Sequence, residues 1–338
     1  MAIQNRMGRI IASIALLVVT LGMISSSAFA QYTLTNLVSD QAGKAKHQDA
    51  SLVNAWGVSF APGGPFWVSD NGTGLSTLYN ASGVKQSLVV TIPTASGSGI
   101  GTPTGQVYNS TPGFVVTQNG VSGAAIFIFA TEDGTLSGWS PGVNASTAVI
   151  GTTTPGAVYT GLAIATNNGD TFLYAADNAN NKVDMFDKNF KLMKSFTDTS
   201  LPAGSNPYNV QTINGKLMVL YSNGTGGGVV DVFDTAGNKI KTLITNGNLH
   251  SPWGVALAPS NFGPASNALL VGNVADGFIN AYNPSSGKLI GKSKVSFSGL
   301  WALAFGDGLG ANGKTNQLFL ASGPNFYQDG LFSMIAPK

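Results

Sequence analysis

The sequence predicts an all-β fold, a six-bladed β-propeller whose ring is closed by an N-terminal strand that pairs with the last blade. Two observations on the whole chain favour β structure: 44 glycines with only 9% charged residues, a composition that suits short strands and tight turns, and no sustained i, i+3, i+4, i+7 apolar spacing after residue 30. A third observation is a recurring motif, clearest at residues 251–259 (SPWGVALAP) and repeated at 55–62 (AWGVSFAP) and 299–305 (GLWALAF).

The spacing of this motif predicts the number of blades. Its six copies follow one another at intervals of 45 to 56 residues, which is the range of propeller blades. A β-helix would repeat roughly every 20 to 25 residues, and a β-sandwich would show no such period. The anchor residues of the copies are Gly57, Gly105, Gly161, Asn209, Gly254 and Ala302.

Each anchor predicts an innermost strand that is followed by two further β-rich runs. Turns rich in Gly and Asn, such as 80–83, 234–237 and 283–287, then lead to a fourth, outer strand. From the first blade to the last, the paired runs are 66–70 with 77–79, 125–130 with 136–139, 171–176 with 182–186, 216–221 with 229–233, 268–271 with 277–282, and 317–321 with 330–335.

The two ends of the predicted ring are expected to meet in one blade. Little chain follows Ile335, so the last blade lacks an outer strand, and the alternating segment 32–38 is expected to supply it. The longest interval between anchors contains residues 147–155, which we expect to form a surface loop.

Residues 1–30 have the pattern of a secretory signal peptide. Arg6 and Arg9 precede an apolar run from Ile10 to Ile24, and small residues lead up to Ala30. The run is shorter than the about 20 residues of a membrane span, although a retained anchor is the alternative. We therefore expect a secreted or periplasmic protein, residues 31–338, that forms one propeller domain without a membrane anchor.

Charge and cysteine content exclude some functions. Arg6 and Arg9 are the only arginines, so residues 31–338 hold 15 lysines and 15 acidic residues and carry no net charge. Without arginine and without a basic cluster, nucleic acid is not an expected partner. The chain also has no cysteine, so the fold must be held by its core rather than by disulfides.

Two stretches carry a resemblance to known families. Residues 173–187 (LYAADNANNKVDMFD) resemble an NHL repeat. Residues 36–40 (NLVSD), 49–57 (DASLVNAWG) and 67–72 (WVSDNG) resemble a family of exported bacterial proteins, some of which carry a PEP-CTERM sorting tail. The resemblance covers nearly all of the chain after residue 30 and implies a bacterial, exported propeller, but it brings no known activity.

The antiparallel strand order predicts where ligands bind. Loops that lead into the innermost strands and loops that follow the second strands lie on one face. Inner-strand tryptophans could line the channel mouth there or pack as core between blades. The predicted ligand-binding residues are Asn54, Trp56, Asp70, Asn71, Asp177, Asn209, Trp253, Asn273 and Trp301.

The same face could hold a metal ion or a catalytic group. Short oxygen-bearing side chains suit Ca²⁺, and the candidates are Asp70, Asp177, Asn223 and Asn273; their alternative role is to form turns. The chain has two histidines, His47 and His250. His250 precedes the motif at 251–259 and is the candidate base or metal ligand, with a turn-anchoring role as the alternative.

The sequence thus favours a secreted binding or scaffold module that holds a protein, peptide or glycan on one face of the ring. The alternative is a metal-dependent lactonase- or lyase-like enzyme with its site at the mouth of the channel. The residues leave open whether the protein is an enzyme and whether it binds calcium. They do not fix the oligomeric state, and a monomer is compatible with them.

Overall fold

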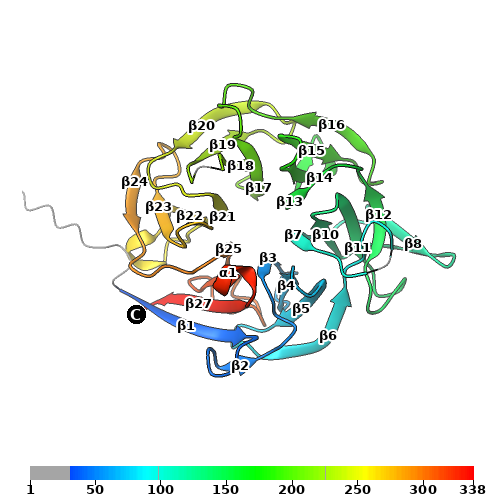
Figure 1. The fold of residues 1–338 in the computed structure, drawn as a ribbon, viewed down its shortest axis with the longest axis horizontal. Coiled ribbons are helices and arrows are strands. Elements are labelled where there is room, and N and C mark those ends of the chain that lie inside the picture. Colours follow the sequence, from blue (N-terminus) through cyan, green and yellow to red (C-terminus); the bar gives the residue numbers. More distant parts are fainter. Residues whose placement is uncertain (1–30, 98, 225) are drawn as a thin grey trace, which may run out of the picture.

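The computed structural model describes residues 31–338 except positions 98 and 225. The predicted signal peptide at 1–30 lies outside the described residues. Six main sheets stand around a central axis, each with its innermost strand beside that axis, as a six-bladed β-propeller (Figure 1). The predicted fold class is confirmed.

Blades 1 to 5 each contain four antiparallel strands, which follow one another along the chain from the innermost to the outermost. Blade 1 has β3 (Ala55–Ser59), β4 (Phe66–Asp70), β5 (Leu75–Tyr79) and β6 (Lys85–Thr91), and blade 2 has β7 (Pro103–Tyr108), β10 (Phe127–Thr131), β11 (Thr135–Trp139) and β12 (Val149–Thr153). Blade 3 has β13 (Tyr159–Asn167), β14 (Asp170–Asp177), β15 (Lys182–Phe186) and β16 (Leu192–Phe196). Blade 4 has β17 (Asn206–Ile213), β18 (Lys216–Ser222), β19 (Gly228–Phe233) and β20 (Lys239–Thr245), and blade 5 has β21 (Pro252–Leu257), β22 (Leu269–Asn273), β23 (Ile279–Tyr282) and β24 (Leu289–Lys292).

Blade 6 closes the ring with both ends of the described chain. It contains β25 (Leu300–Phe305), β26 (Leu318–Ser322), β27 (Leu331–Pro337) and the N-terminal β1 (Tyr32–Ser39), beside which lies the short β2 (His47–Gln48). The register of β1 against β27 runs from Tyr32 opposite Pro337 to Ser39 opposite Leu331. The predicted closure is therefore confirmed: β1 is the outer neighbour of β27, so both ends of the described chain lie in one blade (Figure 1).

The expectation of a surface loop at 147–155 is wrong. This segment contains β12, the outer strand of blade 2. The extra length of the repeat comes instead from a hairpin of β8 (Val115–Gln118) and β9 (Val121–Ala124), which leaves the ring between β7 and β10. Outer strands face solvent on one side, so β12 carries little of the apolar pattern that identifies a buried strand.

Every innermost strand carries a β-bulge at the same position of the motif. The register against the second strand slips by one residue there in all six blades, which adds one side chain at the axis. A Cβ on Gly57 would lie 2.3 Å from the Thr104 carbonyl oxygen of the next blade, and one on Gly105 would lie 2.2 Å from the Leu162 nitrogen. The repeated glycine therefore exists because neighbouring inner strands approach too closely for a side chain.

Helical structure is confined to two short segments of the described chain, η1 (Gly263–Ala265) and α1 (Pro324–Tyr327). No helix among the described residues is both long and apolar enough to cross a membrane. The apolar core lies between adjacent blades, where the two sheet faces pack on each other. Phe66 of blade 1, for example, lies 4.3 Å from Phe319 of blade 6, measured between ring centroids.

Candidate functional site

We call the face where the innermost strands begin the top face, and the face where they end the bottom face. The loops before the innermost strands and after the second strands lie on the top face, because the strands alternate in direction. α1 also lies there, near the axis (Figure 1). The predicted site residues thus belong to one face, but they differ in whether a ligand can reach them.

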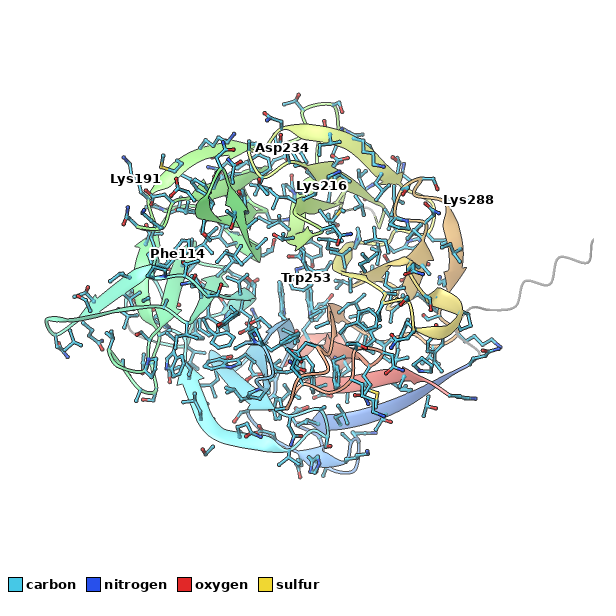
Figure 2. All side chains as sticks on the ribbon, turned by 180° about the vertical axis from the view of Figure 1, so that it is seen from behind. Phe114, Lys191, Lys216, Asp234, Trp253 and Lys288 are labelled. Carbon is cyan, nitrogen blue, oxygen red and sulfur yellow. The ribbon has the colours of Figure 1, made fainter. Side chains whose placement is uncertain are left out.

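Three tryptophans at the bulge positions close the top end of the central channel. The rings of Trp56 and Trp301 stack with centroids 3.6 Å apart, and Trp253 meets both edge-on at 6.2 and 5.9 Å. Trp253 Nε1 donates to the Thr160 carbonyl oxygen, 2.8 Å away and two blades distant. Figure 2 shows Trp253 at the centre of the ring.

These tryptophans are core residues of the ring, the second of the two roles considered for them. Their exposed fractions are only 2 to 5%, and each ring is covered by its neighbours. A ligand would have to displace the cluster to stack on them, so direct binding by Trp56, Trp253 and Trp301 stays a prediction.

A chain of hydrogen bonds connects this cluster to the surface across three blades. Trp301 Nε1 donates to Asn54 Oδ1 at 3.1 Å, Asn54 Nδ2 donates to Asn71 Oδ1 at 3.0 Å, and Asn71 Nδ2 donates to Glu132 Oε2 at 3.0 Å. Asn54 and Asn71 are buried, whereas Glu132 is half-buried. These three hydrogen bonds therefore fix the position of the Glu132 side chain at the rim of the top face.

Two tyrosines pack on the tryptophan cluster at the channel mouth. Tyr208 and Tyr327 lie against Trp301, with ring centroids 5.8 and 5.5 Å away. Burial raises the pKa of the Tyr208 hydroxyl, and the neighbouring Tyr327 and Glu132 raise it by smaller amounts. This hydroxyl therefore stays protonated at any physiological pH and can donate a hydrogen bond.

The turn that carries Tyr327 is strained. Asn325, Phe326 and Tyr327 all have positive φ, at 54°, 54° and 67°, a conformation that is unfavourable for aromatic residues. Phe326 is 89% exposed. Strained backbone of this kind is concentrated at ligand clamps and active sites, which marks the turn as a candidate contact surface.

Most of the remaining predicted ligands are buried. Asp70, Asp177, Asn209 and Asn273 are at most 2% exposed. Asn209 Nδ2 donates to the Trp253 carbonyl oxygen at 2.7 Å, and Asn273 Nδ2 donates to Asp276 Oδ1 at 3.0 Å. These amides serve to hold loops and strands together, so their contact with a ligand is untested and stays a prediction.

Asp70 is the most unusual of these residues. Neither carboxyl oxygen has a hydrogen-bond partner of good geometry among the described residues. Burial raises the pKa of this carboxyl well above its usual value, and the hydrogen bond that the nearby Thr77 can offer lowers it less. Burial therefore disfavours the ionised form of this carboxyl, which is the form that Ca²⁺ binds.

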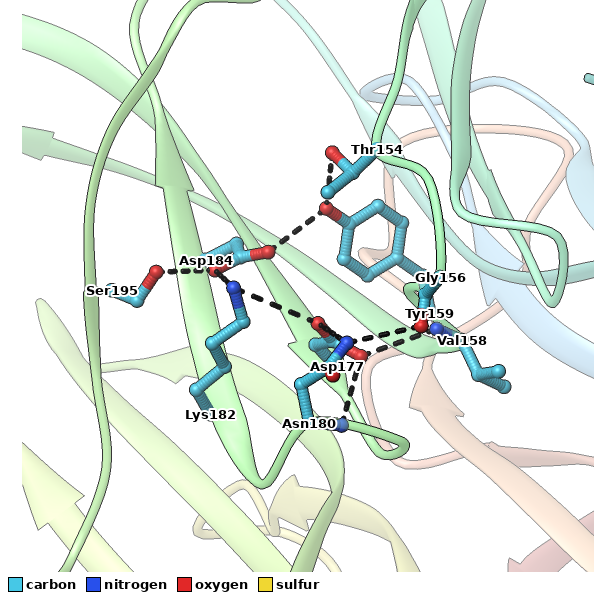
Figure 3. Close-up of polar contacts among 9 residues, drawn as sticks. All are labelled: Thr154, Gly156, Val158, Tyr159, Asp177, Asn180, Lys182, Asp184 and Ser195. Atoms are coloured by element: carbon cyan, nitrogen blue, oxygen red, sulfur yellow. Dashed lines mark hydrogen bonds and ion pairs between the residues drawn. The ribbon is translucent and has the colours of Figure 1, made fainter.

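Asp177 belongs to a well-satisfied polar cluster in blade 3 (Figure 3). It accepts hydrogen bonds from the backbone of Val158 at 3.1 Å and from Asn180 Nδ2 at 2.8 Å. Lys182 Nζ lies 3.1 Å from Asp184 Oδ1 and 3.8 Å from Asp177 Oδ2. The cluster uses the oxygens of Asp177 to fix the turn after β14, which is the alternative role expected for such a residue.

His250 and Asn223 are the predicted residues with the most accessible surface. His250 is 42% exposed in its side chain, and its Nε2 lies 3.9 Å from Asp276 Oδ2. Asn223 Oδ1 accepts a hydrogen bond from the Gly227 nitrogen at 2.8 Å. Within the described part of the chain, no three His, Cys, Asp or Glu side chains are grouped so that they could hold a metal ion.

Below the tryptophans the channel opens into a cavity of about 530 Å³. Trp253 lies at its upper end, and Phe60, Tyr108, Asn214 and Phe305 line it where the innermost strands end at the bottom face. Sequence reasoning missed this cavity because no single residue pattern marks it. The six strand ends that surround it are brought together only by ring closure.

Sequence reasoning also missed Phe326 and Tyr327. The segment 323–327 (GPNFY) combines turn-forming residues with two aromatics, and this combination was the available signal.

The fold and the site define a β-propeller with a closed top face, and comparisons with known proteins agree on the class. Solved structures with this fold include a catalytically inactive virginiamycin B lyase from Staphylococcus aureus with quinupristin, at a TM-score of 0.54 and 10% identity, and a streptogramin B lyase, at 0.57 and 11%. The matches cover 91% and 93% of this chain and all of those chains. At such identities the likeness shows the fold alone.

Sequence relatives show the family. Two uncharacterized proteins of Acanthamoeba polyphaga mimivirus are each 30% identical to this chain over 285 residues; both matches cover 78% of this chain, and they cover 70% and 74% of the relatives. The chain belongs to the family of these viral proteins. No family model matches it.

These relatives are viral rather than exported bacterial proteins, so the expected bacterial family and its PEP-CTERM association have no support from them. The NHL likeness is supported only at the coarser level of a β-propeller.

Proposed function

We propose that the protein is an exported binding module that holds a protein, peptide or glycan on the top face of its ring. The observation that carries the proposal is the strained turn 325–327 on the top face, which exposes Phe326 and holds Tyr327 against Trp301. Exposed aromatics beside fixed polar groups are typical of recognition surfaces.

The closed channel supports a shallow contact with a large ligand over a deep pocket for a small substrate at this face. Trp56, Trp253 and Trp301 fill the axis just below the surface. A ligand at the top face would therefore lie across the loops, where neutral amides and aromatic rings dominate near the axis.

The alternative of a metal-dependent lactonase- or lyase-like enzyme draws on the propeller fold. Virginiamycin B lyase and streptogramin B lyase share that fold at 10 and 11% identity, which carries no catalytic residue across. The nearest candidate group is His250 with Asp276 and Lys292, where Lys292 Nζ lies 3.4 Å from Asp276 Oδ2. The Lys292 ammonium already neutralises the Asp276 carboxylate, which a metal ion would need as a ligand.

The proposal is tested by screening the purified protein against a printed glycan array and a random-peptide display library. Phe326→Asn should weaken any selected ligand by about tenfold or more, since an exposed aromatic anchor is lost, while Asn tolerates positive φ. Leu309→Asn is the matched control, because Leu309 is 73% exposed in a loop of the bottom face. Equal loss in both variants, or binding that survives Phe326→Asn unchanged, would contradict the proposal.

A further inference from the structure

The bottom half of the central channel has a chemistry different from that of the top face. Its cavity of about 530 Å³ falls within the size range of small-molecule sites, roughly 300 to 1,000 Å³. It is bounded at one end by Trp253 and reaches the bottom surface at Asn214, which is exposed. A pocket with one closed end suits a compact ligand rather than a surface partner.

The lining of this cavity is uncharged. None of the residues that line it is Asp, Glu, Lys, Arg or His. Most of the lining is apolar or glycine, and polar groups come from side chains such as Gln211 and Thr212 of blade 4 and Tyr108 of blade 2. An ionised ligand would lose hydration here without gaining a counter-charge.

Some of these polar groups are committed to the protein, and others are not. Thr212 Oγ1 donates to the Ile164 carbonyl oxygen at 2.9 Å, and Gln106 Nε2 donates to the carbonyl oxygens of Gly57 and Trp67, both at 2.8 Å. The side chains of Gln211 and Tyr108 are half-buried. Neither the Gln211 amide nor the Tyr108 hydroxyl forms such a hydrogen bond within the described residues. They can offer both a donor and an acceptor to a ligand.

We infer that the bottom half of the channel is a second site, which binds an uncharged small molecule that has an apolar body and a hydroxyl or N–H group. The apolar walls bind the body of the molecule, and the Gln211 amide orients its polar group. This site opens away from the top face and does not depend on the function proposed there.

A pair of fluorescent probes tests the inference on the intact protein. N-phenyl-1-naphthylamine is neutral and has one N–H, whereas 8-anilino-1-naphthalenesulfonate is nearly the same molecule with an added charge. The neutral probe should bind with a Kd of about 10 μM or below and at least about tenfold more tightly than the sulfonate. It should also quench tryptophan emission, because Trp253 lies at the end of the cavity.

Variants place the probe in the channel. Gln211→Glu adds a carboxylate to the lining and should weaken the neutral probe by about tenfold, while Gln211→Leu keeps the walls apolar and should change its Kd by no more than about threefold. Gln86→Glu makes the same charge change on the outer strand β6 and should have no effect. Equal binding of both probes by the wild-type protein overturns the inference even if Gln211→Glu does not fold. Binding of the neutral probe that is unchanged in a folded Gln211→Glu variant overturns it as well.

Discussion

Blades 3 and 4 carry an aspartate at the same position of the third strand, but the hydrogen bonding of its carboxylate differs between the two blades. Asp184 pairs with Ala175 and Asp231 with Val219, each at the middle of its blade, and both are fully buried. Asp184 accepts hydrogen bonds from the Tyr159 hydroxyl at 3.0 Å and the Ser195 hydroxyl at 2.5 Å (Figure 3). Neither oxygen of Asp231 has such a partner among the described residues.

The difference originates in the innermost strand. The residue just before the bulge is Tyr159 in blade 3 and Pro207 in blade 4, and proline has no donor to offer. Both blades place a lysine between two carboxylates, but Lys239 of blade 4 forms an ion pair with Asp198 and lies 3.7 Å from Asp231 Oδ2, whereas Lys182 of blade 3 lies 3.1 Å from Asp184 Oδ1. A repeated strand pattern therefore fixes the position of a buried carboxylate, while residues of other strands decide whether its charge is satisfied.

The pKa values in blade 4 follow from this arrangement. Burial raises the pKa of Asp231 to about 6, and its neighbour Asp198 adds to the effect, while Thr242 and Lys239 oppose it. Burial also acts to raise the pKa of Asp198, but Lys239 and Ser200 outweigh it and lower the pKa to about 2. A perturbed carboxyl can mark an active site, but Asp231 is out of reach of a substrate and is structural.

The largest expected effect breaks the satisfied cluster of blade 3. Tyr159→Phe removes the hydroxyl that donates to buried Asp184, and should lower the free energy of unfolding at pH 7 by about 2 to 3 kcal/mol, because a hydrogen bond to a charged group is lost. Urea denaturation measures this change. Tyr174→Phe is the matched control: its hydroxyl donates to the neutral Thr235 carbonyl oxygen, and its loss should cost about 1 kcal/mol. Equal costs would show that Asp184 does not need Tyr159.

An intermediate effect concerns pH and blade 4. The pKa of Asp231 is about 6 in the folded protein against 3.8 for an ordinary aspartate, so the folded state binds the proton more tightly than the unfolded state. The stability that comes from this proton is present below about pH 4 and is lost as the pH rises through 6.

Asp231→Asn should remove this loss, on the order of 1 to 2 kcal/mol. Urea denaturation of both proteins at pH 4.5 and pH 7 measures the difference. Asp170→Asn, at an exposed carboxyl of blade 3, should leave the pH profile unchanged. If Asp231→Asn has the wild-type profile, Asp231 is ionised throughout.

The smallest effect compares the two lysines. Lys182→Met should cost about 0.5 kcal/mol, because Lys182 is partly exposed and Asp177 and Asp184 keep their hydrogen bonds. Lys239→Met should cost more, since Asp231 then loses its nearest cation. Thermal unfolding at low and high salt measures both. A greater cost for Lys182→Met would reverse the comparison drawn between the blades.

The candidate site was predictable in part. The repeat placed Trp56, Trp253 and Trp301 at one position of the innermost strand, and the six bulges confirm that equivalence. The alternation of strand direction likewise placed the polar loops on one face. The burial of these tryptophans was not predictable. Trp253 donates a hydrogen bond to Thr160, 93 residues away, and Trp301 donates one to Asn54, 247 residues away. No local pattern reports such contacts.

The all-β class, the six blades and the strand that closes the ring follow from the amino-acid sequence, because a repeat period and strand alternation are local properties that every blade expresses. The closure of the channel top by tryptophans, the uncharged cavity below them and the different hydrogen bonding of Asp184 and Asp231 are visible only in the folded ring. These outcomes depend on which side chains meet across the axis and between blades, and that is settled when the ring closes.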